Sequence, residues 1–266
     1  MATNKVKGLL IDLSGTIHIE SKAIPGAVEA VKRLKASKIP FRFATNTTKI
    51  SSRRLVEQLN QLGFDVEERE IFTSLSACRD LIVSRNLRPM LLMADKAMDE
   101  FESVNTENPN AVVIGLAPSK FNYDTMNQAF RLLMKTDTPE PVPLIAVHKA
   151  KYLADKDEQL SMGPGGFVQA LEFATGKTAT VVGKPSESFF HMALKQIGME
   201  ESPHNVAMIG DDVDSDLGGA AEALGLHRFL VRTGKFRPED EARFKGDNTR
   251  VFDSVVEAID AVIAQY

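Results

Sequence analysis

Short apolar runs alternate with amphipathic segments along much of the chain, and this alternation limits the possible folds more than any other feature. The apolar runs that are typical of strands include residues 8–11, 41–44, 206–209 and 229–231. Elsewhere the spacing of apolar residues indicates helices, for example from about residue 51 to 62 and from about 216 to 225. Continuous apolar strands separated by helices are typical of parallel sheets that helices cover on both faces. The sequence therefore predicts an α/β fold whose core is a doubly wound parallel sheet.

The middle of the chain carries strand and helix signals of its own. Residues 111–114 are an expected strand, and residues 122–135 are an expected helix. A chain of 266 residues has room for about two domains at roughly 150 residues each. We therefore expect a core formed by residues 1–79 and 180–266, with an α/β domain of residues 80–179 inserted into it.

Composition and charge exclude several classes of protein. The chain has 32 basic and 36 acidic side chains, and its net charge of −4 gives no reason to expect binding to nucleic acid or to an anionic membrane. No apolar stretch approaches the roughly 18 residues of a membrane-spanning helix, and the N-terminal apolar run is too short for a signal peptide. The single cysteine, Cys78, excludes an internal disulfide bond and fits a reducing compartment. These features predict a cytoplasmic protein without nucleic-acid or membrane partners.

Polar residues stand at the ends of four expected strands, and a parallel sheet would bring such residues to one edge. They are Asp12, the pair Thr45 and Asn46, Lys184 after an expected strand at 180–182, and Asp211 with Asp212. A carboxylate such as that of Asp12 can attack phosphorus and hold the phosphoryl group as an acyl phosphate. Mg²⁺ prefers oxygen ligands, and Asp12 and Asp211 would supply two of them. Lys184 and Thr45 would bind phosphoryl oxygens. These residues predict Mg²⁺-dependent chemistry on a phosphate.

The same residues lie in four ordered motifs that resemble those of the haloacid dehalogenase (HAD) superfamily. The motifs are Asp-Leu-Ser-Gly-Thr at 12–16, Thr-Asn at 45–46, Gly-Lys-Pro at 183–185, and Gly-Asp-Asp at 210–212 followed by Asp216. The insertion between the second and third motifs resembles the C2-type cap of the nitrophenyl-phosphatase-like branch, and the resemblance covers essentially the whole chain. It implies a HAD-like fold, with a Rossmann-like core, a cap domain, and a phosphatase activity that uses Mg²⁺.

The resemblance also implies a role for each residue of the motifs. Asp12 would be the nucleophile, assisted by Lys184. The Mg²⁺ ligands would be Asp12, Asp211 and the backbone carbonyl of Ser14. Asp216 would steady the metal ligands, and Asp212 is a second candidate for that role. The implied substrate-binding residues are Asp12, Leu13, Ser14, Thr45, Asn46 and Lys184.

Ser14 departs from the pattern, because most phosphatases of the superfamily carry an acid/base Asp at this position. A serine hydroxyl cannot serve as a general acid or base near neutral pH. We therefore expect a preference for good leaving groups, such as those of pyrophosphate, aryl phosphates and compounds with P–N bonds. The alternative is a weakly active or inactive protein that binds a phosphorylated ligand or a partner. A true dehalogenase is disfavoured, because displacing a halide from carbon would leave the metal-binding carboxylates unexplained.

The expected partner is a small phosphorylated substrate. Two histidines, His18 just after the first motif and His148 in the insertion, are further candidates for contacting it. Related proteins often dimerise through the cap, so a homodimer is compatible with the resemblance.

Overall fold

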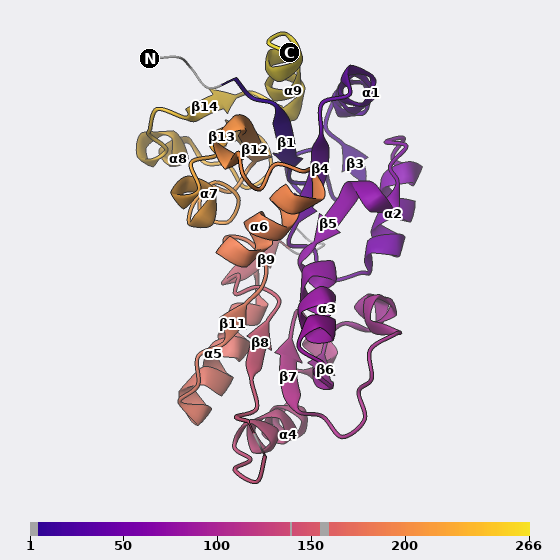
Figure 1. The fold of residues 1–266 in the computed structure, drawn as a ribbon, viewed down its shortest axis with the longest axis vertical. Helices are drawn as coiled ribbons and strands as arrows, with labels where there is room; N and C mark the ends of the chain where they lie inside the picture. The colour runs from indigo at the N-terminus through magenta and orange to yellow at the C-terminus, as the bar shows by residue number, and fades with distance from the viewer. Residues whose placement is uncertain (1–4, 139, 155–159) are drawn as a thin grey trace. The chain divides into compact units, whose positions relative to one another are not determined.

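The structure is a computed structural model that describes residues 5–138, 140–154 and 160–266. The chain divides into two compact units (Figure 1). Unit 1 contains Met1–Thr45, Arg54–Phe72 and Lys184–Tyr266, and unit 2 contains Asn46–Arg53 and Thr73–Gly183. The predicted roles of a core and an inserted cap stay predictions.

Unit 1 is built on a six-stranded sheet in the order β14-β13-β12-β1-β4-β5. The strands are β1 (Gly8–Ile11), β4 (Phe41–Thr45), β5 (Ile71–Thr73), β12 (Val206–Gly210), β13 (His227–Val231) and β14 (Thr249–Phe252). β1 pairs in parallel with β12 on one side and with β4 on the other. Every residue of β1 and β12 is buried, as expected for strands whose two faces are covered by helices.

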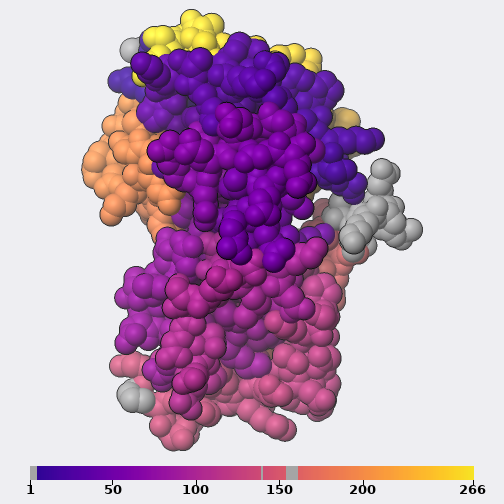
Figure 2. Space-filling model, turned by 90° about the vertical axis from the view of Figure 1, so that its right-hand side faces the viewer, coloured from indigo at the N-terminus to yellow at the C-terminus, as the bar shows by residue number. Residues whose placement is uncertain are grey.

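The helices of unit 1 come from both ends of the chain. They are α1 (Ala27–Ser37), α2 (Ser52–Gln61), which begins in unit 2, α6 (Glu187–Gln196), α7 (Ala220–Ala223), α8 (Pro238–Arg243) and α9 (Val255–Ile263). α1 packs against α9, and α6 contacts both β4 and α7. In Figure 2 the indigo surface of the first helix therefore lies beside the yellow surface of the last one.

Unit 2 has its own parallel sheet in the order β11-β8-β7-β6. Its elements are α3 (Ser74–Ser84), β6 (Pro89–Leu92), β7 (Ala111–Ile114), α4 (Tyr123–Leu133), β8 (Leu144–Ala146), β9 (Tyr152–Ala154), β10 (Leu160–Met162), α5 (Pro164–Thr175) and β11 (Thr180–Val181). Its core joins strands and helices around buried residues such as Val112, Leu132 and Val168. Stacked rings of Phe121 and Phe167, with centroids 3.8 Å apart, pack against this core.

Two sequence-based expectations are wrong in detail. The strand before Lys184 was expected in the same sheet as Asp12, but β11 pairs with β8 in unit 2. The helix expected from about residue 216 begins only at Ala220. The chain before it is held in turns instead, because one carboxylate oxygen of Asp212 accepts the N–H groups of Asp214 and Ser215.

Short 3₁₀ helices lie at Glu68–Glu70, Pro118–Lys120 and Pro203–Asn205, and a longer one lies at Asp95–Phe101. β2 (His18–Ile19) pairs with β3 (Lys22–Ala23) in a short hairpin. Within the three described ranges, no helix combines the length and the apolar character needed to span a membrane.

Phe189 offers a test of the core of unit 1. Its ring is fully buried and lies 4.8 Å, centroid to centroid, from the ring of Phe72. Phe189→Ala leaves a cavity, so we expect the free energy of unfolding to fall by about 3–5 kcal/mol. The matched control is Phe173→Ala, because Phe173 is 89% exposed and its loss should cost less than about 0.5 kcal/mol. Urea unfolding of both variants measures the difference, and equal changes would contradict this packing.

Candidate active site

The carboxyl ends of three neighbouring strands bring polar residues to one edge of the sheet in unit 1. Asp12 directly follows β1, Thr45 is the last residue of β4, and Asp211 directly follows β12. The chain runs from β1 to β4 and β5 on one side, and later to β12, β13 and β14 on the other. Asp12 therefore lies at the topological switch point, where open α/β sheets bind their ligands.

Lys184 joins this edge through its side chain and not through a strand of the sheet. Its Nζ atom lies 2.6 Å from Asp12 Oδ1 and 2.7 Å from Asp216 Oδ1. It also donates a hydrogen bond of 2.6 Å to the carbonyl oxygen of Ala44, the residue before Thr45. The Lys184 side chain is only 1% exposed. One buried ammonium group therefore links the ends of β1 and β4 with the segment after β12.

Burial and charge shift the pKa values of this cluster strongly. Burial raises the pKa of Asp216 to about 7, although Lys184 works against the shift. Burial, followed by the charges of Asp216 and Asp12, raises the pKa of Asp211 well above its ordinary value. Burial tends to lower the pKa of Lys184, but the carboxylates of Asp12 and Asp216 outweigh it, so this pKa is raised. Lys184 is therefore charged at neutral pH. An additional positive charge nearby would stabilise the ionised forms of Asp211 and Asp216.

Three carboxyl groups of this cluster fit a divalent cation. Asp12, Asp211 and Asp216 each offer one oxygen, and these oxygens all lie within 4.8 Å of one another. All three residues are buried. Hard oxygen donors that repel one another in a buried site are the donor set that Mg²⁺ prefers. The residues present therefore fit the expected ion.

Asp212 lies outside this group of three. Its Oδ2 atom pairs with Lys235 Nζ at 3.0 Å, and its Oδ1 atom accepts the N–H groups of Asp214 and Ser215. Asp216, by contrast, pairs directly with Lys184 and also accepts the N–H of Asp212. Asp212 therefore shapes the turn after β12, while Asp216 belongs to the charged cluster.

The turn after Asp12 is tight and held by its own backbone. The carbonyl oxygen of Leu13 accepts the N–H groups of Thr16, Ile17 and His18. The Leu13 side chain is fully buried, whereas Ser14 is exposed. The Ser14 side chain is therefore accessible to solvent, whereas only the backbone of Leu13 remains available to a ligand.

The remaining residues predicted to contact the substrate are divided between the two units. His18 lies in unit 1, where its Nδ1 atom is 2.9 Å from the carbonyl oxygen of Glu20. Burial lowers the pKa of His18, against opposing effects of that hydrogen bond and of Asp12. Asn46 and His148 belong to unit 2, where His148 Nε2 lies 3.2 Å from the hydroxyl of Thr48.

A loop that the sequence reasoning missed completes the arrangement around Asp211. Residues 233–235, Thr-Gly-Lys, follow β13, and the backbone N–H of Lys235 donates to Asp211 Oδ2 at 2.7 Å. The pKa of Lys235 is raised. Burial alone would lower it, but the charges of Asp212, Asp216 and Asp211 favour the ammonium form. The signal was present, because polar residues directly follow the apolar run 229–231.

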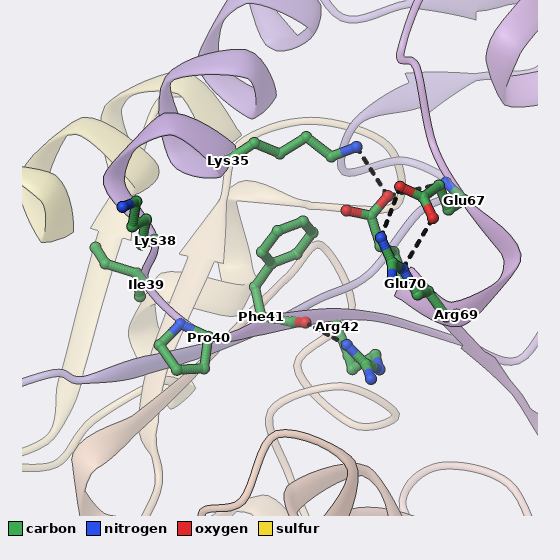
Figure 3. A pocket seen from close by; sticks show the side chains of 9 residues that line it. All are labelled: Lys35, Lys38, Ile39, Pro40, Phe41, Arg42, Glu67, Arg69 and Glu70. Atoms are coloured by element: carbon green, nitrogen blue, oxygen red, sulfur yellow. Dashed lines mark hydrogen bonds and ion pairs between the residues drawn. The ribbon is translucent and has the colours of Figure 1, made fainter.

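A pocket of about 410 Å³ at the other end of β4 differs in kind from this edge (Figure 3). Nine residues line it, among them Phe41 and Arg42 at the start of β4. Lys35 pairs with Glu70 at 2.8 Å, and Arg69 pairs with Glu67 at 2.8 Å. These ion pairs use both acidic residues of the lining, so Lys38 and Arg42 leave it positively charged, and none of the nine lining residues is an Asp, Ser, His or Cys. It offers no counterpart to the buried cluster around Lys184.

Comparison with known proteins identifies the family. A family model described as haloacid dehalogenase-like hydrolase matches residues 9–107, and a second, described as HAD-hydrolase-like, matches residues 181–258. Haloacid dehalogenase-like hydrolase domain-containing protein 2 from Bos taurus is 50% identical over 264 residues, which are 99% of this chain and 98% of the relative. The phospholysine phosphohistidine inorganic pyrophosphate phosphatase of Homo sapiens is 41% identical over 262 residues, with 97% and 94% covered.

The solved structures confirm the predicted α/β fold. The p-nitrophenyl phosphatase from Archaeoglobus fulgidus matches with a TM-score of 0.84 at 28% identity, and the match covers 97% of this chain and 99% of that one. The chain therefore belongs to the haloacid dehalogenase-like hydrolase family and is an enzyme of that family.

Proposed function

We propose that this enzyme is a Mg²⁺-dependent phosphatase that hydrolyses a small phosphorylated compound through a phosphorylated Asp12. The observation that carries the proposal is the buried Lys184, whose ammonium group touches both Asp12 and Asp216. This pairing places a carboxylate nucleophile beside a fixed positive charge, which is what a reaction that transfers a phosphoryl group needs. The names of the two phosphatase relatives support the same reaction class.

The proposed reaction has two steps. A carboxylate oxygen of Asp12 attacks phosphorus, a new O–P bond forms, and the bond to the leaving group breaks, with the electron pair going to the leaving group. A water molecule then attacks the phosphorylated Asp12, releases inorganic phosphate and regenerates the carboxylate. Lys184 stabilises the negative charge on the phosphoryl oxygens, because its contacts with Ala44 and Asp216 hold it in place. Thr45 and Asn46 are proposed to bind the same oxygens.

Asp12, Asp211 and the backbone carbonyl of Ser14 are proposed to hold Mg²⁺, with Asp216 and Asp212 supporting them. The bound ion would reduce the repulsion between these carboxylates and an anionic phosphate. The three oxygens that lie within 4.8 Å of one another support this assignment.

The proposal also covers the domains, partners and localisation of the chain. Residues 1–79 and 180–266 are proposed as the catalytic core and residues 80–179 as a C2-type cap, with residues 46–53, 73–79 and 180–183 of that core lying in unit 2 of the structure. The net charge of −4 supports the absence of nucleic-acid partners. The single cysteine, whose burial raises the pKa of its thiol to about 12, is compatible with a reducing cytoplasm. A homodimer remains part of the proposal, as do contacts of His18 and His148 with the substrate.

Asp12→Asn tests the nucleophile. We expect hydrolysis of p-nitrophenyl phosphate with Mg²⁺ to fall by about a thousandfold or more, because an amide oxygen is a much weaker nucleophile. The matched control is Asp260→Asn, since Asp260 is a half-exposed carboxylate on α9 that pairs with Arg33, and it should keep the wild-type rate. Equal rates for wild type and Asp12→Asn would instead favour the alternative of a phospholigand-binding protein.

Removal of divalent cations tests the metal site. Excess EDTA should abolish turnover, because the site then lacks the positive charge that is proposed to offset the carboxylates and the anionic substrate, and added MgCl₂ should restore the rate. EDTA that has been saturated with Mg²⁺ beforehand is the control and should have no effect. Full activity of a protein dialysed against EDTA would refute the metal requirement.

Ser14→Asp tests the proposed preference for good leaving groups. An Asp at this exposed position could protonate a poor leaving group, so the ratio of alkyl to aryl phosphate turnover should rise by about tenfold or more. Ser14→Ala should leave that ratio as in the wild type. If Ser14→Asp also leaves it unchanged, the absent acid/base group does not set the preference.

A further inference from the structure

The loop of residues 233–235 contacts two segments of the site in unit 1 at once. It follows β13, whose carboxyl end lies beside that of β12 because the two strands pair in parallel. One contact reaches the carboxylate of Asp211, and the other reaches the turn after Asp12. The loop therefore connects a proposed metal ligand with the segment that carries the proposed nucleophile.

The contact with Asp211 fixes the orientation of its carboxylate. The backbone N–H of Lys235 donates to Asp211 Oδ2 at 2.7 Å. The ammonium group of Lys235 lies elsewhere and pairs with Asp212 Oδ2 at 3.0 Å. Asp211 therefore receives a directional hydrogen bond from the loop, while the charge of Lys235 pairs with the neighbouring side chain. A hydrogen bond of this kind sets which oxygen of a carboxylate faces a cation.

The contact with the turn after Asp12 is equally direct. The hydroxyl of Thr233 donates a short hydrogen bond to the carbonyl oxygen of Gly15. Gly15 and Gly234 both have positive φ angles, +92° and +60°. A Cβ atom on Gly15 would lie 2.6 Å from Asp211 Cγ, and one on Gly234 would lie 2.9 Å from the same atom. Both distances are shorter than real Cβ contacts, so the carboxylate of Asp211 fills the space that two side chains would need.

We propose that the 233–235 loop is a positioning element for Asp211, holding its carboxylate against the turn that follows Asp12 in the geometry that binds the divalent cation. This inference rests on the proposed function. Thr233, Gly234 and Lys235 are positioning residues, since they act through Asp211 and Gly15. Partners that orient metal ligands typically contribute about tenfold to hundredfold to metal affinity or activity.

Gly234→Ala tests the proposal, because the new Cβ would overlap Asp211 Oδ2 and the Cα atom of Gly15. We expect the dissociation constant for Mn²⁺, measured by calorimetry without substrate, to rise by about tenfold or more. The Mg²⁺ concentration for half-maximal hydrolysis should rise by a similar factor. The matched control is Gly198→Ala, since Gly198 has a comparable φ of +68° but no atom within 4 Å of an added Cβ. It bears the same backbone strain and should bind Mn²⁺ like the wild type.

Thr233→Val is the second variant, and it keeps the test decisive if Gly234→Ala does not fold. It removes the hydroxyl at nearly constant shape, and it should weaken Mn²⁺ binding, whereas Thr233→Ser should restore it. Wild-type Mn²⁺ affinity in Gly234→Ala, or in Thr233→Val when Gly234→Ala is unfolded, would overturn the positioning role and leave the proposed phosphatase standing. A wild-type protein that neither binds Mn²⁺ nor hydrolyses p-nitrophenyl phosphate would instead refute the proposed function, and this inference with it.

Discussion

The ion pairs of a single buried lysine are the interaction on which the rest of this site depends. Three buried carboxyl groups repel one another, and each ionised group removed from water costs several kcal/mol. Lys184 compensates one negative charge while contacting Asp12, Asp216 and the backbone of β4. If all three carboxyl groups are ionised, one ammonium group leaves two negative charges in excess. Burial together with this repulsion is why the pKa values of Asp211 and Asp216 are raised when no further cation is present. The same arrangement that makes the cluster costly thus supports the proposed divalent-cation site.

The parallel sheet determines where these charged residues lie. Because β1 has β4 on one side and β12 on the other, the residues after these strands lie close together at one edge of the sheet, although they are far apart in the sequence. Gly15 and Gly234 lack side chains, so the carboxylate of Asp211 can lie directly against their backbone. The strand order brings the carboxylates together, and hydrogen bonds from the loops orient them.

Much of this could be predicted from the sequence, because the decisive signals are local. A buried parallel strand is a continuous apolar run, so Asp12 and Asp211 could be placed at strand ends directly. The partner of a strand as short as residues 180–181 is not encoded in its apolar pattern, and β11 accordingly joined the other sheet. The turns before α7 depend on the Asp212 carboxylate, which competes with a helix that the periodicity favoured. The 233–235 loop could be placed at a strand end from the sequence, but its contacts with Gly15 and Asp211 join segments that are separate in the sequence, so its proposed role could not be predicted.

The pairing of β1 also has a consequence for how the chain is made. β1 is synthesised well before its partner strand β12, in which Val206 pairs with Gly8, and the ammonium group that neutralises Asp12 lies 172 residues later. Contacts between such distant residues form slowly, because the intervening chain must first be brought into a closed loop. During synthesis β1 can therefore pair with β4 on one side, while its other side stays unpaired until residues 206–210 have been made. An apolar strand with an unpaired edge favours aggregation during that interval.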